Sequence, residues 1–218
     1  MTAAEYVANM LLTATGENST AVSGDDDWTK ALSIGNLLID QWAKETDWVS
    51  LYSIVPIGTV TATDSFDLDD SIREISSQDG DYIRINHTDG TNYTDYTLVH
   101  PNRLKFYATG PYVAQIGDQL VFNKAFVSTD QQFGGTINVP SYLYADHLVN
   151  DTDDVPVDDP NWLVMAGAAE WARTDLTLAQ NYPLLLQKAN DLMDGMKKAN
   201  SPQLMTIPKD PVARGMEW

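Results

Sequence analysis

The spacing of apolar residues changes twice along this chain, from a helical repeat to a strand repeat and back. A helix ending near Gly16 is predicted by an i, i+3, i+4, i+7 stripe that consists of Val7, Met10, Leu11 and Ala14. A second helix is predicted from about 27 to 45 by the same spacing, and the aspartates at 25–27 suit the free N–H groups and dipole of a helix start. The chain therefore has to combine a helical part with a strand part.

From Trp48 to Val149 the apolar residues alternate with polar ones or form short β-branched and aromatic runs. Asp-Gly, Pro-Asn, Gly-Pro and Gly-Gly pairs separate these runs, one of which is RLKFYA. About eight to nine short strands in roughly a hundred residues predict an antiparallel β-sandwich or barrel-like module. Asp-Gly pairs within 78–81 and 88–91 predict hairpin turns, because such turns require positive φ angles.

Helical spacing returns after Asn161. One helix is predicted by a face that consists of Trp162, Met165, Ala166, Ala169 and Ala172 or Arg173. A last helix covers Asn181 to Ala199, with its start placed at 177–182 because Pro183 fits only the first helical turn. The final stretch, SPQLMTIPKDPVARGMEW, contains three prolines and no apolar period. We therefore expect an extended arm at the C-terminus.

These elements predict an α+β fold in which the two N-terminal and two C-terminal helices pack as one four-helix bundle, since neither pair alone buries its apolar stripes. The β module is inserted between the two helix pairs. The predicted boundaries are residues 1–46 for the N-terminal helical half, 47–150 for the β module, 151–200 for the C-terminal helical half and 201–218 for the arm.

Composition excludes several kinds of function. The 218 residues contain no cysteine, which rules out thiolate catalysis and thiolate metal sites. With 31 acidic against 13 basic residues the net charge is −18, and so acidic a chain is not expected to grip nucleic-acid phosphates tightly. The opening residues carry an acid where an export signal carries a base, and no apolar run is long enough for a membrane span, so neither is expected.

Histidine is scarce, and none of the motifs of nucleotide-binding, zinc-protease or α/β-hydrolase sites is present. The three histidines, His87, His100 and His147, are interpreted as ordinary strand or surface residues. A Ser-His-Asp arrangement stays open, because its members need be close only in space. Paired carboxylates of a glycoside hydrolase also stay open, although nothing selects one pair among so many acids. We expect no enzymatic activity.

Two acidic runs suggest a calcium site, because clustered carboxylates supply the oxygen ligands that calcium takes. The runs are Asp64, Asp67, Asp69 and Asp70, and then Asp151, Asp153, Asp154, Asp158 and Asp159. The second run does not fit an EF-hand, since the positions for an oxygen ligand, glycine and glutamate hold Val155, Pro156 and Trp162. We interpret it as a connector whose end caps the next helix, and predict no metal and no cofactor.

Charged and apolar residues are distributed unevenly along the chain. Residues 1–160 hold 25 acidic and 7 basic side chains, whereas 161–218 hold 6 of each, so the first three quarters carry the whole surplus. The arm combines slight basic character with the apolar residues Leu204, Met205, Ile207, Val212, Met216 and Trp218. A proline-interrupted segment cannot bury such side chains against itself. Either the arm docks into another protein, or it folds back on its own domain.

Three stretches of the sequence carry a resemblance to a known family. They are DDDWTKALSIGNLLIDQWAKETDWVSL leading into the strands, INVPSYLYADHLV, and DDVPVDDPNWLVMAGAAEWARTDLTLAQNYPLLLQKANDLMDGMKK. In this layout the chain resembles the head-to-tail adaptor, or connector, proteins of tailed bacteriophages over roughly residues 1–200. Its β module is longer than in that family, and its proline-bearing arm resembles that of only some members.

The resemblance implies a non-enzymatic virion protein located in the neck between capsid portal and tail and assembled in the host cytoplasm. Such adaptors form rings, typically of twelve copies, that bind the portal protein, extend the DNA channel and offer a platform to the next tail or neck protein. Genomic DNA passes through the channel without specific binding, which suits an acidic subunit. Because C-terminal segments of some adaptors contact the portal, that role falls here on Leu204 to Trp218, with Met205, Ile207 and Trp218 as the main anchors.

An alternative function is a β-sandwich module that binds a glycan or a host surface. Exposed aromatic rings are suitable stacking platforms for such ligands. The β region offers Tyr82, Tyr93, Tyr96, Tyr107, Tyr112, Tyr142 and Tyr144. Most of these tyrosines alternate with polar residues, as core or cross-strand residues do.

Overall fold

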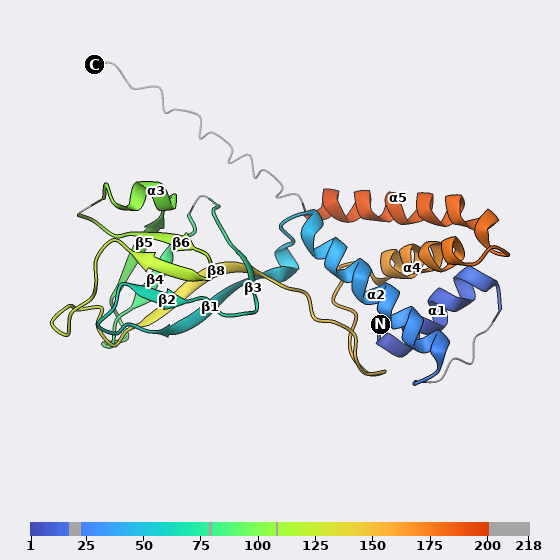
Figure 1. Ribbon diagram of the computed structural model, residues 1–218, viewed down its shortest axis with the longest axis horizontal. Coiled ribbons are helices and arrows are strands. Elements are labelled where there is room, and N and C mark those ends of the chain that lie inside the picture. The colour runs from blue at the N-terminus through green and yellow to red at the C-terminus, as the bar shows by residue number, and fades with distance from the viewer. Residues whose placement is uncertain (18–22, 79, 108, 201–218) are drawn as a thin grey trace, which may run out of the picture.

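The computed structural model describes residues 1–17, 23–78, 80–107 and 109–200. Two units lie side by side, a helical one and a curled β-sheet, so the fold is mixed α+β (Figure 1). The chain passes from the helical unit to the sheet after residue 45 and returns after residue 143. No helix in the described ranges combines the length and the apolar character that crossing a bilayer requires.

The helices of the helical unit begin and end at residues with recognisable local sequence signals. It consists of α1 (Ala3–Thr15), α2 (Asp26–Glu45), α4 (Pro160–Thr174), the short η2 (Ala179–Asn181) and α5 (Tyr182–Asn200). Thr2 and Glu5 form a capping box at the start of α1, and Gly16 ends it with a φ of 78°. Asp159 caps α4, and Pro183 lies in the first turn of α5. The predicted helix end at Gly16, the predicted cap of α4 and the predicted place of Pro183 are confirmed, and the capping box of α1 is an additional finding.

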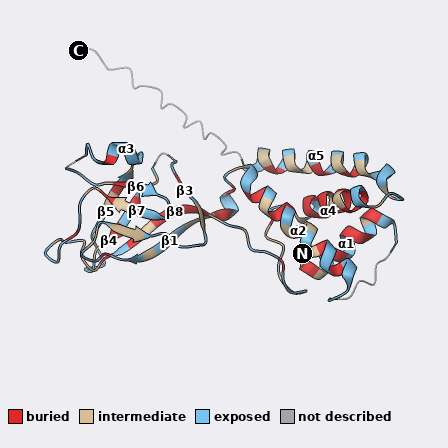
Figure 2. Ribbon diagram, in the orientation of Figure 1, coloured by how far each residue is buried: buried red, intermediate tan, exposed pale blue. Residues whose placement is uncertain are grey.

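The prediction of a four-helix bundle is wrong, because α4 is a central helix and not one of four equal corners. Helices α1, α2 and α5 each pack against α4, which is almost entirely buried (Figure 2). A bundle helix buries one stripe. The alanines and glycine of α4, among them Ala166, Gly167 and Ala168, instead let neighbours approach on several sides. The apolar spacing marked only one face of this helix, and the residues on its other faces gave no sign that they too are covered.

Close approach between α1 and its neighbours depends on two glycines that face Tyr6. A Cβ atom at Gly35 of α2 would lie 2.8 Å from Tyr6 Cε1, and one at Gly167 of α4 would lie 2.6 Å from the Tyr6 hydroxyl oxygen. Tyr6 is fully buried, and burial raises the pKa of its hydroxyl. The ring of Tyr6 is therefore held between two helices at positions where only glycine leaves room.

The β unit is one curled sheet of eight strands. In chain order they are β1 (Tyr52–Thr59), β2 (Ser65–Asp67), β3 (Ile72–Ile75), β4 (Ile83–Asn86), β5 (Tyr93–Leu98), β6 (Tyr112–Ile116), β7 (Gln119–Phe122) and β8 (Thr136–Leu143). The order across the sheet is β1-β8-β4-β5-β6-β7-β2, and β3 also pairs with β8. Curling brings the end strands β1 and β2 into contact and encloses a core rich in Ile, Val and Phe.

The sheet differs from the predicted antiparallel module in one pair, because β5 and β6 are parallel. The segment between them includes the short helix α3 (Pro101–Leu104), where the sequence pattern predicted a strand. The His100 side chain caps this helix and Pro101 occupies its first position, a favourable place for proline. The chain therefore crosses over between β5 and β6 and does not turn back as a hairpin.

The two predicted hairpin turns have different outcomes. At 88–91 the prediction is confirmed: β4 and β5 pair antiparallel, Gly90 has a φ of 72°, and Asp89 Oδ1 accepts hydrogen bonds of 2.9 Å from the Thr91 and Asn92 amides. The second turn, 78–81, includes residue 79, which lies outside the described residues. The strands on either side of it do not form a hairpin, since β3 and β4 both pair with β8.

Candidate interaction surfaces

The acidic runs form turns and caps in this structure. Asp69 Oδ1 accepts a 2.9 Å bond from the Ser71 amide, and Asp153 Oδ2 accepts 2.7 Å bonds from the amides of Val149 and Asn150. The Ser71 hydroxyl, which also donates to Asp69, and the Ser71 amide lower the pKa of the Asp69 carboxyl, and the two amides lower that of Asp153. Across the described ranges, no group of three or more His, Cys, Asp and Glu residues is arranged to hold a metal ion.

Each histidine side chain contacts another residue of the described chain. His87 Nε2 lies 2.9 Å from Thr94 Oγ1, and His100 Nδ1 accepts a 3.2 Å bond from the amide of Asn102. His147 Nε2 lies 2.9 Å from Asp40 Oδ1, which ties the segment after β8 to helix α2. These contacts are of the kind that hold turns and elements in place.

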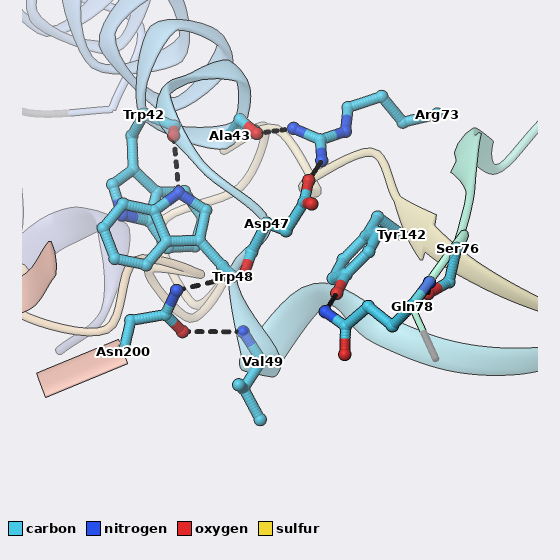
Figure 3. A network of polar contacts seen from close by, with 10 residues as sticks. All are labelled: Trp42, Ala43, Asp47, Trp48, Val49, Arg73, Ser76, Gln78, Tyr142 and Asn200. Carbon is cyan, nitrogen blue, oxygen red and sulfur yellow. Dashed lines mark hydrogen bonds and ion pairs between the residues drawn. The ribbon is translucent and has the colours of Figure 1, made fainter. Parts of the chain in front are cut away.

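The end of α2 carries the first part of the junction between the two units. Trp48 stacks on Trp42 with ring centroids 5.0 Å apart, and its Nε1 donates a 2.6 Å bond to the Trp42 carbonyl (Figure 3). Arg73, on β3, donates to the Ala43 carbonyl and to Asp47 Oδ1 at 3.2 Å. The last four carbonyls of a helix lack partners within it. Two of these carbonyls are thus satisfied here, one of them by a side chain of the sheet unit.

The end of α5 closes the junction from the other side. The Asn200 side chain accepts a 2.9 Å bond from the Val49 amide and donates a 3.0 Å bond to the Asp47 carbonyl (Figure 3). Lys197 Nζ lies 2.6 Å from Glu45 Oε2. The ends of α2 and α5 and the strand β3 therefore meet at one place, which fixes the helical unit against the sheet.

A groove runs along the helical unit, because α2 and α5 lie on either side of α4. Its volume is about 480 Å³, within the range of about 300–1,000 Å³ typical of ligand pockets. The apolar lining consists of Leu38, Trp42, Trp162, Ala166, Leu186, Ala189 and Met193. The polar lining includes the carboxylates of Glu45, Glu170 and Asp194. Among the described residues, the buried Trp42 Nε1 has no hydrogen-bond acceptor.

The outer face of the sheet has a second hollow, of about 370 Å³, over β1, β8 and β4. Ile54 and Tyr82 line it and are 61% and 46% exposed. Arg84, also in the lining, forms a two-bond ion pair with Asp95 at 2.7 and 3.0 Å, and its guanidinium lies 4.0 Å from the centre of the Tyr93 ring. The hollow thus combines apolar surface, a cation paired with Asp95, the amides of Asn86 and Asn138, and the carboxylate of Asp81, which accepts a 2.9 Å bond from the Tyr52 hydroxyl.

The tyrosines singled out in the sequence divide between surface and interior. Tyr82, Tyr93 and Tyr144 are exposed, whereas Tyr96 and Tyr142 are buried. The remaining two, Tyr107 and Tyr112, lie against each other with ring centroids 4.2 Å apart. Only part of the set can serve as a platform for a ligand.

The arm residues that were predicted to dock, Leu204, Met205, Ile207, Val212, Met216 and Trp218, lie outside the described residues. The groove and the junction were missed by sequence reasoning. The available signals were Trp48, three residues after the end of α2, and an arginine, Arg73, inside a short strand. Neither signal identifies the residue that it contacts, because the contacts join segments far apart in the chain.

No protein-family model matches this sequence, and no curated protein matches it.

Proposed function

We propose that this chain is a structural subunit, a head-to-tail adaptor of a tailed bacteriophage that assembles as a ring between portal and tail. The observation that supports it best is the junction, where Arg73, Trp48 and Asn200 hold the helical unit against the sheet. A ring subunit needs such a brace, since it joins one partner above to another below and has to keep its two contact surfaces at a fixed angle.

Charge supports the same proposal. The surplus of acidic side chains lies in residues 1–160, which include the sheet, α1 and α2. A negatively charged wall repels DNA, so a polyanion can slide through a channel without sticking to it. The partners in this proposal are identical copies, the portal protein and the next tail or neck protein, and the place of assembly is the virion neck.

Mass photometry of the full chain with the portal protein of the same phage tests this proposal. We expect discrete species whose mass exceeds that of the portal by a multiple of the 24.1 kDa subunit, about twelve copies. An unrelated acidic protein of similar size is the control. A portal mass that stays unchanged at low and high salt would argue against the adaptor role.

The hollow on the sheet favours a second candidate function, binding of a neutral glycan. Exposed Tyr82 and Ile54 can pack against the C–H face of a sugar ring, and Asn86 and Asn138 can bond its hydroxyls. Asp95 neutralises Arg84 and the Asp81 carboxylate also lines the hollow, so an uncharged ligand suits it better than an anion. Glycan-array binding that Tyr82→Ala abolishes would support this function. Tyr144→Ala, at an exposed tyrosine outside the hollow, is the matched control.

A further inference from the structure

The groove between α2 and α5 presents apolar surface that nothing in the described chain covers. Leu186 and Met193 on its α5 side are only partly buried, and the rim carries Glu45, Glu170 and Asp194. Two of these three carboxylates already form ion pairs within the chain. An occupant that fits therefore has to bring apolar side chains above all.

The last 18 residues of the chain leave from one end of this groove. The described part ends at Asn200, one helical turn beyond Lys197, which lines the groove. The α5 side of the groove runs from Leu186 to Lys197, about 16 Å at the helical rise. An extended segment of 18 residues spans up to about 60 Å. The C-terminal segment is therefore long enough to turn back and run the whole groove.

The composition of the segment matches the groove. Met205 and Ile207 share one side of an extended chain, and Pro202 and Pro208 oppose helix formation on either side of them. Asp210 follows Lys209, so residues 203–210 carry no net charge, and the match to the groove is one of apolar side chains.

We propose that in the free subunit residues 203–210 occupy the α2–α4–α5 groove of their own chain. Attachment next to the groove favours the chain's own segment over a second copy, because the tether gives an effective concentration in the millimolar range. The proposal goes beyond the adaptor function: Met205 and Ile207, the side chains expected at the portal, would be stored in the groove until a partner displaces them.

Because the chain lacks cysteine, a pair of introduced cysteines gives an unambiguous test. The test pair is Met193→Cys, which lines the groove, with Met205→Cys. The matched control is Asp191→Cys with Met205→Cys, since Asp191 is exposed on the same helix, does not line the groove and has nearly the same tether length. A short bismaleimide linker accommodates small errors in register.

We expect intrachain cross-links in the free full-length protein, formed about tenfold faster by the 193/205 pair than by the 191/205 pair. Equal rates in the two pairs would overturn the proposal. Cross-links only between chains would also overturn it and would assign the groove to a second copy.

A further substitution in the test pair separates specific docking from random collision. Ile207→Asp should slow the 193/205 cross-link about tenfold or more, because burial of one isoleucine is worth at least that factor in an equilibrium constant. Val212→Asp lies in the same segment but outside 203–210, and should leave the rate unchanged. A rate insensitive to Ile207→Asp would refute groove docking. No portal is involved, so failure here is distinct from failure of the adaptor proposal.

Discussion

Removing the guanidinium of Arg73 should destabilise the junction between the two units. Arg73→Met keeps most of the apolar stem but removes the bond to the Ala43 carbonyl at the end of α2 and the ion pair with Asp47. It also removes a positive charge from the C-terminal end of a helix, where the dipole favours one. The change thus affects contacts between the units and leaves each core intact.

The magnitude follows from the individual contacts. A hydrogen bond from a charged donor contributes about 1.5–3 kcal/mol. The ion pair adds at most about 1 kcal/mol, because the Asp47 side chain is 52% exposed. Arg73 Nε is buried without an acceptor among the described residues, and its removal offsets part of the loss. We expect a net loss of about 2 kcal/mol, or a Tm lower by about 4–8 °C for a chain of this length.

Urea unfolding followed by tryptophan fluorescence measures this loss, with Trp42 and Trp48 reporting on the junction itself. Arg73→Lys is the control: it keeps the charge but loses the forked geometry, so its stability should lie between those of Arg73→Met and the parent chain. A change below about 0.5 kcal/mol for Arg73→Met would refute the reasoning, since that is the size expected for an ordinary surface substitution.

Three other predictions follow from packing and titration. Gly167→Ala should lower the free energy of unfolding by about 1–2 kcal/mol, because the added methyl group clashes with Tyr6. Helix propensity alone would raise that free energy by about 1 kcal/mol, and a rise of this size in urea unfolding would contradict the prediction. Trp48→Phe removes the donor to the Trp42 carbonyl at the end of α2 and should lower the free energy of unfolding by about 1–2 kcal/mol. Thermal unfolding measures this loss, and an unchanged Tm would contradict it. Burial raises the pKa of Tyr52 and Tyr96 from 10.0 to about 12, assisted by nearby carboxylates. Their stabilising effect is complete below pH 10 and lost between pH 10 and 12, so the urea midpoint should fall over that range, and a constant midpoint would exclude it.

Local signals predicted the helix ends well. Gly16 and Pro183 act within one or two turns, so the sequence pattern contains them completely. The central position of α4 was not predicted, because the apolar spacing marked only one of its faces, whereas its alanines and glycine allow packing on other sides as well. The arrangement of three helices around one depends on which neighbours approach, and no single-helix pattern records that.

For the sheet and the candidate surfaces as well, local sequence patterns predicted only part of the structure. The alternation of apolar and polar residues predicted most of the strands. Around Pro101, however, the capped helix α3 stands in place of one expected strand, and β5 and β6 pair in parallel. The Arg73 contact with α2 joins residues 30 positions apart, and the groove exists only because α2 and α5 lie apart on α4. Contacts of this kind are set by tertiary packing and leave no mark on local spacing.

Electron microscopy of the portal protein incubated with the full chain tests the adaptor role most directly. We predict class averages in which an added ring extends the portal channel, with every subunit holding its sheet at the same angle to its helices. Portal particles with no added density, from a chain shown to be folded, would contradict the proposed function.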